Sequence, residues 1–335
     1  MEPNSRDGPP HPLVVIGASF GGVEALMTLV AGLPKDLQAF VALVLHVGHH
    51  PSILPELLSR AGPLRAVHPR EGEPMQLGRI YVAPPDHHLL VGAGALHLSR
   101  GPRENHTRPA IDPLFRSAAL HWGSAAIGVV LTGELDDGTA GLAAIKSCGG
   151  IAVVQDPQEA AAPSMPASAL GNVQVDHCVL LPAIPPLLVR LVGTAPPRAP
   201  QTAPEALVRE QSIFEGIDPM ENLKAIATPS QLTCPECGGT LSEIHAGPPL
   251  RFRCHTGHAY SAKSLNSAQA EKTDHTLQSS VRALQEREQL LLRMAAVARA
   301  LDDEPQAHAG LQEAARVRER FRRLAELLTA EAGGA

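Results

Sequence analysis

The chain has 335 residues, 44% of which are hydrophobic, and its formal net charge is −6. This length allows one large domain with a buried core and a smaller one beside it. The acidic balance argues against nucleic acid as the main partner, because proteins that bind nucleic acid usually carry a basic surface. The polar, proline-rich residues 1–12 and the short apolar run after them fit neither a signal peptide nor a membrane span. We therefore expect a cytoplasmic protein with no direct membrane insertion.

Short apolar runs alternate with helical stretches from residue 13 to about residue 190. The runs lack strict alternation, which predicts strands buried on both faces, as in a parallel α/β sheet. The strands are expected at 13–17, 40–46, 80–83, 88–91, 95–99, 126–133, 151–156 and 178–182. Helices are expected at about 21–32, 51–61, 111–122, 138–148, 164–172 and 183–192. The glycines between the strands at 88–91 and 95–99 predict an antiparallel hairpin.

The remainder of the chain divides into three predicted segments. Residues 193–229 are interpreted as a linker, because GTAPPRAPQTAP at 193–204 is rich in proline and alanine and has no core pattern. A small cysteine-containing segment follows at 230–262. Two long periodic stretches then predict an antiparallel helical hairpin or coiled coil over 267–332. Their apolar positions are Leu277, Val281, Leu284, Leu291, Met294, Val297, Val317, Phe321, Leu324 and Leu328.

A serine at the first predicted strand-to-helix turn is a candidate nucleophile. The stretch Gly17-Ala-Ser19-Phe-Gly21 matches the nucleophile elbow, in which small residues let the chain turn sharply and expose a serine hydroxyl. Ser19 could instead be only the N-cap of the helix in a glycine-rich turn. A phosphate-binding loop fits less well, because the Walker lysine and the G-x-G-x-x-G spacing are both absent.

Two residues could activate this serine. A serine hydroxyl needs a base to take its proton and a third group to hold that base. In a parallel sheet such groups lie at the carboxyl ends of neighbouring strands. His46 ends one predicted strand and Asp137 follows another. The order Ser, His, Asp differs from that of α/β-hydrolases, which predicts another fold. Two further histidines are expected to be solvated in the loop after His46, namely His49 and His50.

Six motifs in order resemble the catalytic domain of the chemotaxis receptor methylesterase family, CheB, over residues 13–192. The motifs are Gly17–Gly22, the strand ending in His46, RIYVAPPDHHLLV (79–91), RPAIDPLFRSAA (108–119), VVLTGELDDGTAG (129–141) and VVQDPQEAAAPSMPASAL (153–170). The resemblance implies a doubly wound, mainly parallel α/β fold. It also implies hydrolysis of γ-glutamyl methyl esters on receptor helices, and deamidation of particular receptor glutamines.

The resemblance also assigns roles to individual residues. It implies that Ser19 is the nucleophile, that His46 is the general base and that Asp137 orients the histidine. The backbone amides of Phe20 and Glu134 would donate to the oxyanion, and no cofactor is implied for catalysis. The neighbouring aspartate, Asp136, is expected to be a turn or cap residue.

The chain departs from the family pattern in several places. Phe20 replaces threonine or a small residue, and the family's T-G-M-G-x-D-G reads TGELDDG from Thr132 to Gly138. Glu134 would oppose a developing oxyanion unless its side chain points to water, and Leu135 takes the place of the second glycine. Only about a dozen residues precede the first predicted strand, so the resemblance is to a stand-alone type without a receiver domain.

The segment CPECGGTLSEIHAGPPLRFRCHTGH at 234–258 has the spacing of a small zinc ribbon or knuckle. The predicted ligands are Cys234, Cys237, Cys254 and His258. His255 could replace His258, and His245 is a more distant alternative. The interpretation without a metal is that the four residues are reduced and unligated. Three thiolates and one imidazole leave no open position for water, which predicts structural zinc. Because so short a segment has little core, the metal would supply its stability, separately from the esterase.

The leading hypothesis is a serine esterase that acts on methylated receptor cytoplasmic helices through an acyl-enzyme on Ser19. A receptor methyltransferase and a separate response regulator are further candidate partners. The alternative is a catalytically weak or inactive binding or scaffold protein in a signalling complex, which Glu134 and Leu135 favour. An unrelated small-ester hydrolase is a third hypothesis.

Overall fold

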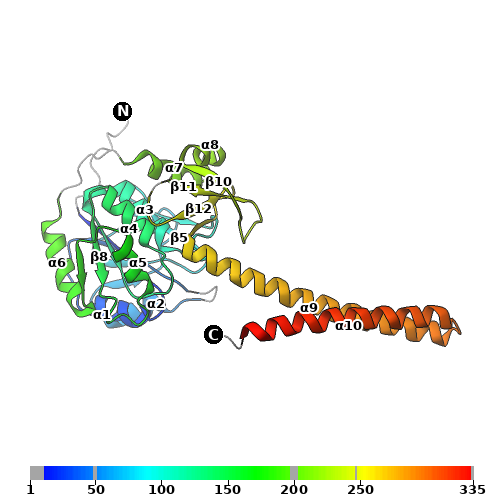
Figure 1. Ribbon diagram of the computed structural model, residues 1–335. Helices are drawn as coiled ribbons and strands as arrows, with labels where there is room; N and C mark the ends of the chain where they lie inside the picture. Colours follow the sequence, from blue (N-terminus) through cyan, green and yellow to red (C-terminus); the bar gives the residue numbers. More distant parts are fainter. Residues whose placement is uncertain (1–10, 48–50, 197–202, 246, 333–335) are drawn as a thin grey trace. The chain divides into compact units, whose positions relative to one another are not determined.

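The computed structural model describes residues 11–47, 51–196, 203–245 and 247–332 (Figure 1). The contacts within the chain define two compact units, Met1–Leu265 and Asn266–Ala335. The first unit contains the predicted α/β domain and the cysteine segment together. The second consists of the two long C-terminal helices.

A parallel sheet forms the centre of the first unit. Among the described residues it has seven strands in the order β3-β4-β2-β1-β7-β8-β9. The strands are β1 (Leu13–Ala18), β2 (Phe40–Leu45), β3 (Arg65–Val67), β4 (Arg79–Val82), β7 (Ala126–Val130), β8 (Ile151–Gln155) and β9 (His177–Val179). β1 pairs with β2 on one side and with β7 on the other, so the chain adds strands first on one side of β1 and then on the other. The order of the strands therefore reverses at β1, where open α/β sheets usually bind ligands.

Helices cover both faces of this sheet, which confirms the predicted doubly wound α/β fold. One apolar core joins the sheet to α1 (Gly22–Ala31), α2 (Leu54–Ala61) and α6 (Ile184–Thr194). The other joins it to α3 (Ile111–Trp122), α4 (Thr139–Ser147) and α5 (Ser164–Asn172). The strands β5 (His88–Val91) and β6 (Leu96–Ser99) form the predicted antiparallel hairpin. Two short 3₁₀ turns lie at Gly123–Ala125 and Leu181–Ala183.

The predicted linker over 193–229 contains two helices, α7 (Glu205–Phe214) and α8 (Pro219–Ile226). Their apolar side chains are buried at Leu207, Ile213, Phe214, Leu223 and Ile226. The interpretation as a linker was therefore wrong beyond the proline-rich stretch. Each helix is short, so neither gives a long periodic signal, and both are stabilised mainly by tertiary packing.

The cysteine segment folds as a four-stranded antiparallel sheet, which we call the ribbon. Its strands are β10 (Ala227–Thr233), β11 (Thr240–Ile244), β12 (Arg251–Cys254) and β13 (Ala259–Ser261). Residues 103–105 of the α/β domain lie beside β13. Here Glu104 forms a parallel bridge with Ala259, and Asn105 N donates to Ala259 O at 2.8 Å. The ribbon is thus hydrogen-bonded directly to the α/β domain.

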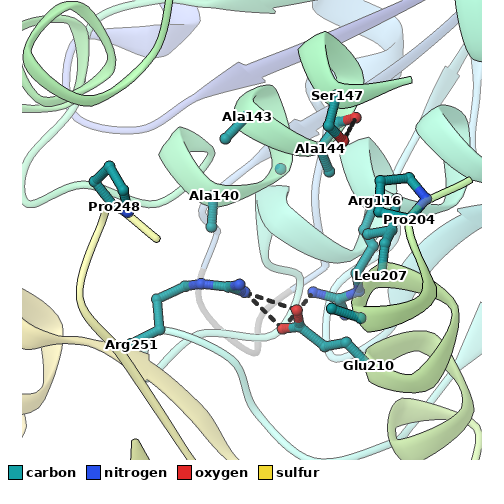
Figure 2. A pocket seen from close by; sticks show the side chains of 12 residues that line it. Arg116, Ala140, Ala143, Ala144, Ser147, Pro204, Leu207, Glu210, Pro248 and Arg251 are labelled. Carbon is teal, nitrogen blue, oxygen red and sulfur yellow. Dashed lines mark hydrogen bonds and ion pairs between the residues drawn. The ribbon is translucent and has the colours of Figure 1, made fainter. Parts of the chain in front are cut away.

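Buried ion pairs connect the ribbon to the α/β domain. We call the residues involved the charge cluster: Glu104, Arg116, Glu210, Arg251 and Arg253. Arg253 is fully buried and contacts Glu104 at 2.8 Å and Glu210 at 3.0 Å. Figure 2 shows Glu210 between Arg116 and Arg251, beside a pocket of about 140 Å³. The burial of these charges is tolerable only because each has oppositely charged partners.

The second unit is a helical hairpin, as predicted. Helices α9 (Ala262–Ala300) and α10 (Glu304–Ala332) are joined by a turn in which Asp302 has a φ of 58°. Small residues dominate the buried positions between them, namely Ala295, Ala298, Ala307, Ala314 and Val317. Met294 and Val297, which belong to the predicted apolar positions, are 53% and 48% exposed instead. None of the described helices is both long and apolar enough to cross a membrane.

Replacing Arg253 by methionine should lower the free energy of unfolding by roughly 3–5 kcal/mol, because the buried carboxylates of Glu104 and Glu210 each lose one of their cationic partners. Chemical denaturation of the full chain measures this loss. The matched control is Arg209→Met in the exposed Arg209–Glu205 pair, which should cost less than about 1 kcal/mol. Equal losses in the two variants would contradict a dominant role for the charge cluster.

Candidate active site

Ser19 lies directly after β1, in a tight turn that leads into α1. Its backbone N donates to Thr132 O at 2.9 Å, which ties the turn to the chain after β7. Gly21 has a φ of 72°, and a Cβ atom there would lie 2.6 Å from Ala161 Cβ. Both the backbone angle and the lack of space require glycine at this position. The turn therefore presents the Ser19 hydroxyl at the carboxyl edge of the sheet.

The structure brings Ser19, His46 and Asp137 into one line of hydrogen bonds. His46 Nδ1 lies 3.0 Å from Ser19 Oγ, and His46 Nε2 lies 2.8 Å from Asp137 Oδ2. An ionised carboxylate can only accept, so Nε2 carries the proton and Nδ1 is free to accept from the serine hydroxyl. The two ring nitrogens thus exchange the places that they have in the serine-protease template, where Nε2 faces the serine.

Asp137 is a buried carboxylate that is surrounded by N–H donors. Besides His46, the donors are Asn105 Nδ2 (2.8 Å), Ile111 N (2.6 Å), Gly138 N (2.9 Å) and Asp112 N (3.2 Å). Burial raises the pKa of Asp137, but the hydrogen bond and charge of His46, followed by the Ile111 and Asn105 bonds, hold it below its ordinary value. Asp137 therefore carries the negative charge that can stabilise a protonated His46.

Two further aspartates lie close to Asp137. Asp112 accepts from Gly141 N at 2.6 Å, and burial and the charge of Asp137 raise its pKa well above its ordinary value. The carbonyl of Asp136 accepts from Thr139 N, as expected for a turn residue. Its side chain also accepts from Ser261 Oγ of the ribbon at 2.5 Å. Neither Asp112 nor Asp136 contacts the histidine in the described structure.

The loop after β7 packs closely against Ser19. A Cβ atom at Gly133 would lie 2.7 Å from Ser19 Cβ and 2.1 Å from Met165 Sδ, so only glycine fits there. Leu135, which replaces the family's second glycine, has a φ of 60°. The Glu134 side chain is exposed to solvent. The loop thus keeps its turn without the second glycine, and the glutamate carboxylate is hydrated.

The sequence also named two backbone amides and two loop histidines near this site. The backbone amides of Phe20 and Glu134 have no hydrogen-bond acceptor among the described residues, and both could donate to a bound oxyanion. The Phe20 side chain is 65% exposed. His49 and His50, which the sequence predicts to be solvated in the loop after His46, lie outside the described residues.

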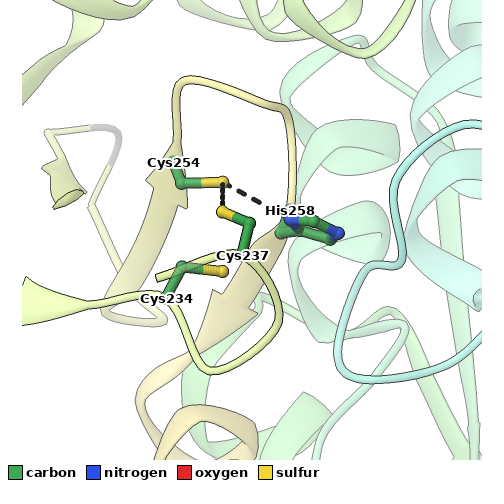
Figure 3. A group of neighbouring side chains, drawn as sticks. All are labelled: Cys234, Cys237, Cys254 and His258. Carbon is green, nitrogen blue, oxygen red and sulfur yellow. Dashed lines mark hydrogen bonds between the residues drawn. The ribbon is translucent and has the colours of Figure 1, made fainter. Parts of the chain in front are cut away.

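A second group of candidate functional side chains lies in the ribbon (Figure 3). The ligand atoms of Cys234, Cys237, Cys254 and His258 lie within 4.8 Å of one another. Cys234 and Cys237 belong to the turn between β10 and β11. Cys254 ends β12, and His258 lies in the turn between β12 and β13. Three sulfur atoms and one imidazole nitrogen at these distances fit a four-coordinate metal ion.

The two alternative ligands named from the sequence lie outside this group. His255 lies next to Gly239, where a Cβ atom would be 2.7 Å from its ring. His245 Nε2 is 2.6 Å from Thr228 Oγ1 at the far end of the ribbon. The geometry therefore favours His258 as the fourth ligand. Thr256 Oγ1, 2.9 Å from Cys254 Sγ, adds a hydroxyl contact to the group.

Analysis of the sequence missed Asn105 and Asp112 as part of the active-site hydrogen-bond network. Asp112 lies within the motif at 108–119, and Asn105 lies three residues before the start of that motif. Both are polar and buried: Asp112 is 5% exposed and Asn105 is 6% exposed. No local pattern distinguishes a buried asparagine in a loop from an exposed one, so only the three-dimensional structure reveals the contact.

Comparisons with known proteins agree with this geometry. The family model for CheB methylesterase matches residues 14–188. A Leptospira interrogans protein, provisionally named protein-glutamate methylesterase/protein-glutamine glutaminase, is 38% identical over 180 residues, or 53% of this chain and 93% of that protein. An Anaeromyxobacter dehalogenans protein named protein-glutamate methylesterase/protein-glutamine glutaminase 2 is also 38% identical over 180 residues, or 53% of each chain.

A solved structure gives the same result for the fold. The crystal structure of the Thermotoga maritima CheB methylesterase catalytic domain is 31% identical, with a TM-score of 0.52. The alignment covers 54% of this chain and 99% of that domain. Because the family model and the solved domain both match the α/β domain that carries Ser19, the chain belongs to the CheB methylesterase family.

Proposed function

We propose that the chain is a cytoplasmic serine hydrolase that demethylates glutamyl methyl esters on the cytoplasmic helices of methylated chemoreceptor-like proteins. Deamidation of glutamines on the same helices is the second proposed reaction. The single observation that carries the proposal is the line of hydrogen bonds from Ser19 through His46 to Asp137. Membership of the CheB methylesterase family supports the choice of substrate.

The proposed reaction proceeds through an acyl-enzyme. As Ser19 Oγ attacks the ester carbonyl, its proton moves to His46 Nδ1, and Asp137 stabilises the resulting imidazolium. The amides of Phe20 and Glu134 donate to the oxyanion of the tetrahedral intermediate. The C–O bond to the methoxy group then breaks, and His46 protonates the departing methanol. Water, deprotonated by His46, hydrolyses the acyl-enzyme to a glutamate carboxylate; with a glutamine substrate, ammonia leaves instead.

Glu134 and Leu135, which in the sequence favour a scaffold protein, are compatible with an enzyme in this geometry. A hydrated Glu134 carboxylate opposes the oxyanion less than a buried one, because water screens its charge. Leu135 adopts the left-handed conformation that a glycine would otherwise supply. Ser19, His46 and Asp137 are in contact despite both departures. We therefore favour turnover over binding alone.

We further propose that the four clustered ligands hold a structural zinc ion. Thiolates and imidazole are the donors that zinc prefers, and four protein ligands leave no place for water or substrate. When bound, the metal would link the two turns of the ribbon. It takes no part in the proposed ester hydrolysis, which uses protein side chains and backbone amides alone.

Ser19→Ala should lower the release of methanol from a methylated receptor cytoplasmic fragment by roughly 10³-fold or more, because the nucleophile is removed. Its melting temperature should stay close to that of the wild type. Ser147→Ala, which removes an exposed hydroxyl bonded to its own helix, is the control and should retain full activity. Methanol release that survives in Ser19→Ala would contradict the proposal.

Metal analysis of the purified full chain should find about one zinc ion per chain. Cys237→Ser should bind less metal and make the ribbon more susceptible to proteolysis, because a ligand thiolate is lost. The exposed cysteine outside the group, Cys178, provides the control Cys178→Ser, which should keep its metal. Wild-type protein free of metal after purification in zinc-containing medium would overturn this assignment.

A further inference from the structure

We propose that Asn105 is a positioning residue for Asp137 and that the junction of β13 and α9 holds Asn105 in place, so that the esterase depends on its own ribbon. This inference rests on the proposed function, because it concerns the alignment of the same catalytic residues. It gives the ribbon a role in turnover, whereas the sequence alone suggests that ribbon and esterase act separately.

The side-chain amide of Asn105 uses both of its N–H groups on carboxylates of the active site. Its Nδ2 atom donates to Asp137 Oδ1 at 2.8 Å and to Asp112 Oδ2 at 2.9 Å. It thereby lies between two buried carboxyl groups and donates to both of them. A hydrogen bond to a buried charged group is among the stronger ones in proteins. Asn105 thus fixes the position of the oxygen of Asp137 that does not face His46.

The carbonyl end of the same amide is held by the ribbon. Asn105 Oδ1 accepts from Ser261 N at 3.0 Å and from Ser264 Oγ at 2.9 Å. Ser261 is the last residue of β13, and Ser264 lies in the first turn of α9. The backbone N–H of Ser261 can only donate, so it sets which end of the amide faces the carboxylates. If the amide were reversed, its oxygen would face two carboxyl groups and its NH₂ would face the N–H of Ser261.

The backbone around Asn105 is bound to the same strand. Asn105 has a φ of 49°, a conformation that costs energy for a residue other than glycine and persists only where surrounding contacts hold it. Its N–H donates to Ala259 O, and Ala259 N donates to Arg103 O at 3.3 Å. The adjacent Glu104 is paired with Arg253 of β12. Strand pairing and a buried ion pair therefore hold residues 103–105 on the ribbon.

A second contact reaches the loop that carries Asp137. The hydroxyl of Ser261 donates to the side chain of Asp136, the residue immediately before Asp137. β13 thus contacts the catalytic aspartate on two sides, through Asn105 and through Asp136. If the ribbon loosens, Asp137 loses the support of both contacts while Ser19 and His46 remain on the parallel sheet. We expect turnover to fall more than substrate binding does.

The first test compares kcat and KM for methanol release in Asn105→Ala and Asn105→Asp. Asn105→Ala should lower kcat by roughly 10–100-fold with little change in KM, since a bond to a charged group is lost. Asn105→Asp keeps the shape but replaces the donor by a third carboxyl group, so its loss should be larger. An unchanged kcat in Asn105→Ala, or an Asn105→Asp variant as active as the wild type, would overturn the proposal.

The second test asks whether the junction acts through Asn105. Ser264→Ala should lower kcat by several-fold in the wild type and by nothing further in the Asn105→Ala background, because coupled residues are not additive. The matched control is Ser280→Ala, which removes a hydroxyl bonded to Thr276 O within α9 and should leave kcat unchanged. Fully additive effects of Ser264→Ala and Asn105→Ala would overturn the coupling.

A substrate-independent readout separates this inference from the proposed function. A fluorophosphonate probe phosphonylates an activated serine with loss of fluoride, so its rate reports on Ser19 even where no methyl ester is cleaved. Failure of wild type to release methanol, with rapid probe labelling that Asn105→Ala slows, would overturn the choice of substrate and keep the inference. Equal labelling rates in wild type and Asn105→Ala would overturn the inference alone. Melting temperatures of all variants identify any general loss of fold.

Discussion

The candidate active site depends on one buried negative charge, that of Asp137. Asp137 can stay ionised inside the protein only because donors surround it, and three of these donors come from different parts of the fold. His46 comes from the end of β2, Ile111 N from the start of α3 and Asn105 from the loop beside the ribbon. To hold this carboxylate, the sheet, the helix and the loop must meet at one point. The same arrangement fixes the proton of His46 on Nε2 and leaves Nδ1 toward Ser19.

Local pattern was sufficient to predict most of the sheet and the helices beside it. Apolar runs without alternation predicted the parallel strands. Of the seven described strands of this sheet only β3 (Arg65–Val67), which is three residues long and forms an edge of the sheet, was missed. The helices α7 and α8 were missed because their stability comes from tertiary contacts rather than from periodicity. In the helical hairpin, small residues pack between the helices and leave Met294 exposed. Periodicity predicts that a helix has an apolar face, but it does not predict which side chains a partner helix buries.

In the candidate site, too, local sequence predicts some residues and tertiary contacts are needed to find the others. Ser19 and His46 could be found from the sequence because a strand end and a glycine-rich turn fix their places, and Asp137 could be found from the motif around it. The clustered cysteines and histidine could be found because their spacing is typical of a small zinc ribbon. Asn105 had no such signal, since its partners Ser261 and Ser264 are more than 150 residues away in the chain. Contacts between distant segments need the tertiary structure, and here they include those that hold Asp137.

The charge cluster gives a physical reason why the ribbon and the α/β domain form one unit. Arg253 has no exposure to solvent, and the carboxylates of Glu104 and Glu210 are also buried. If the ribbon separated from the domain, these groups would lose their partners across the interface, and Asn105 would lose the two donors on its carbonyl. A buried charge without its partner is costly, so partial detachment is unfavourable. The ribbon is therefore held in one position, and that position is the one in which Asn105 can donate to Asp137.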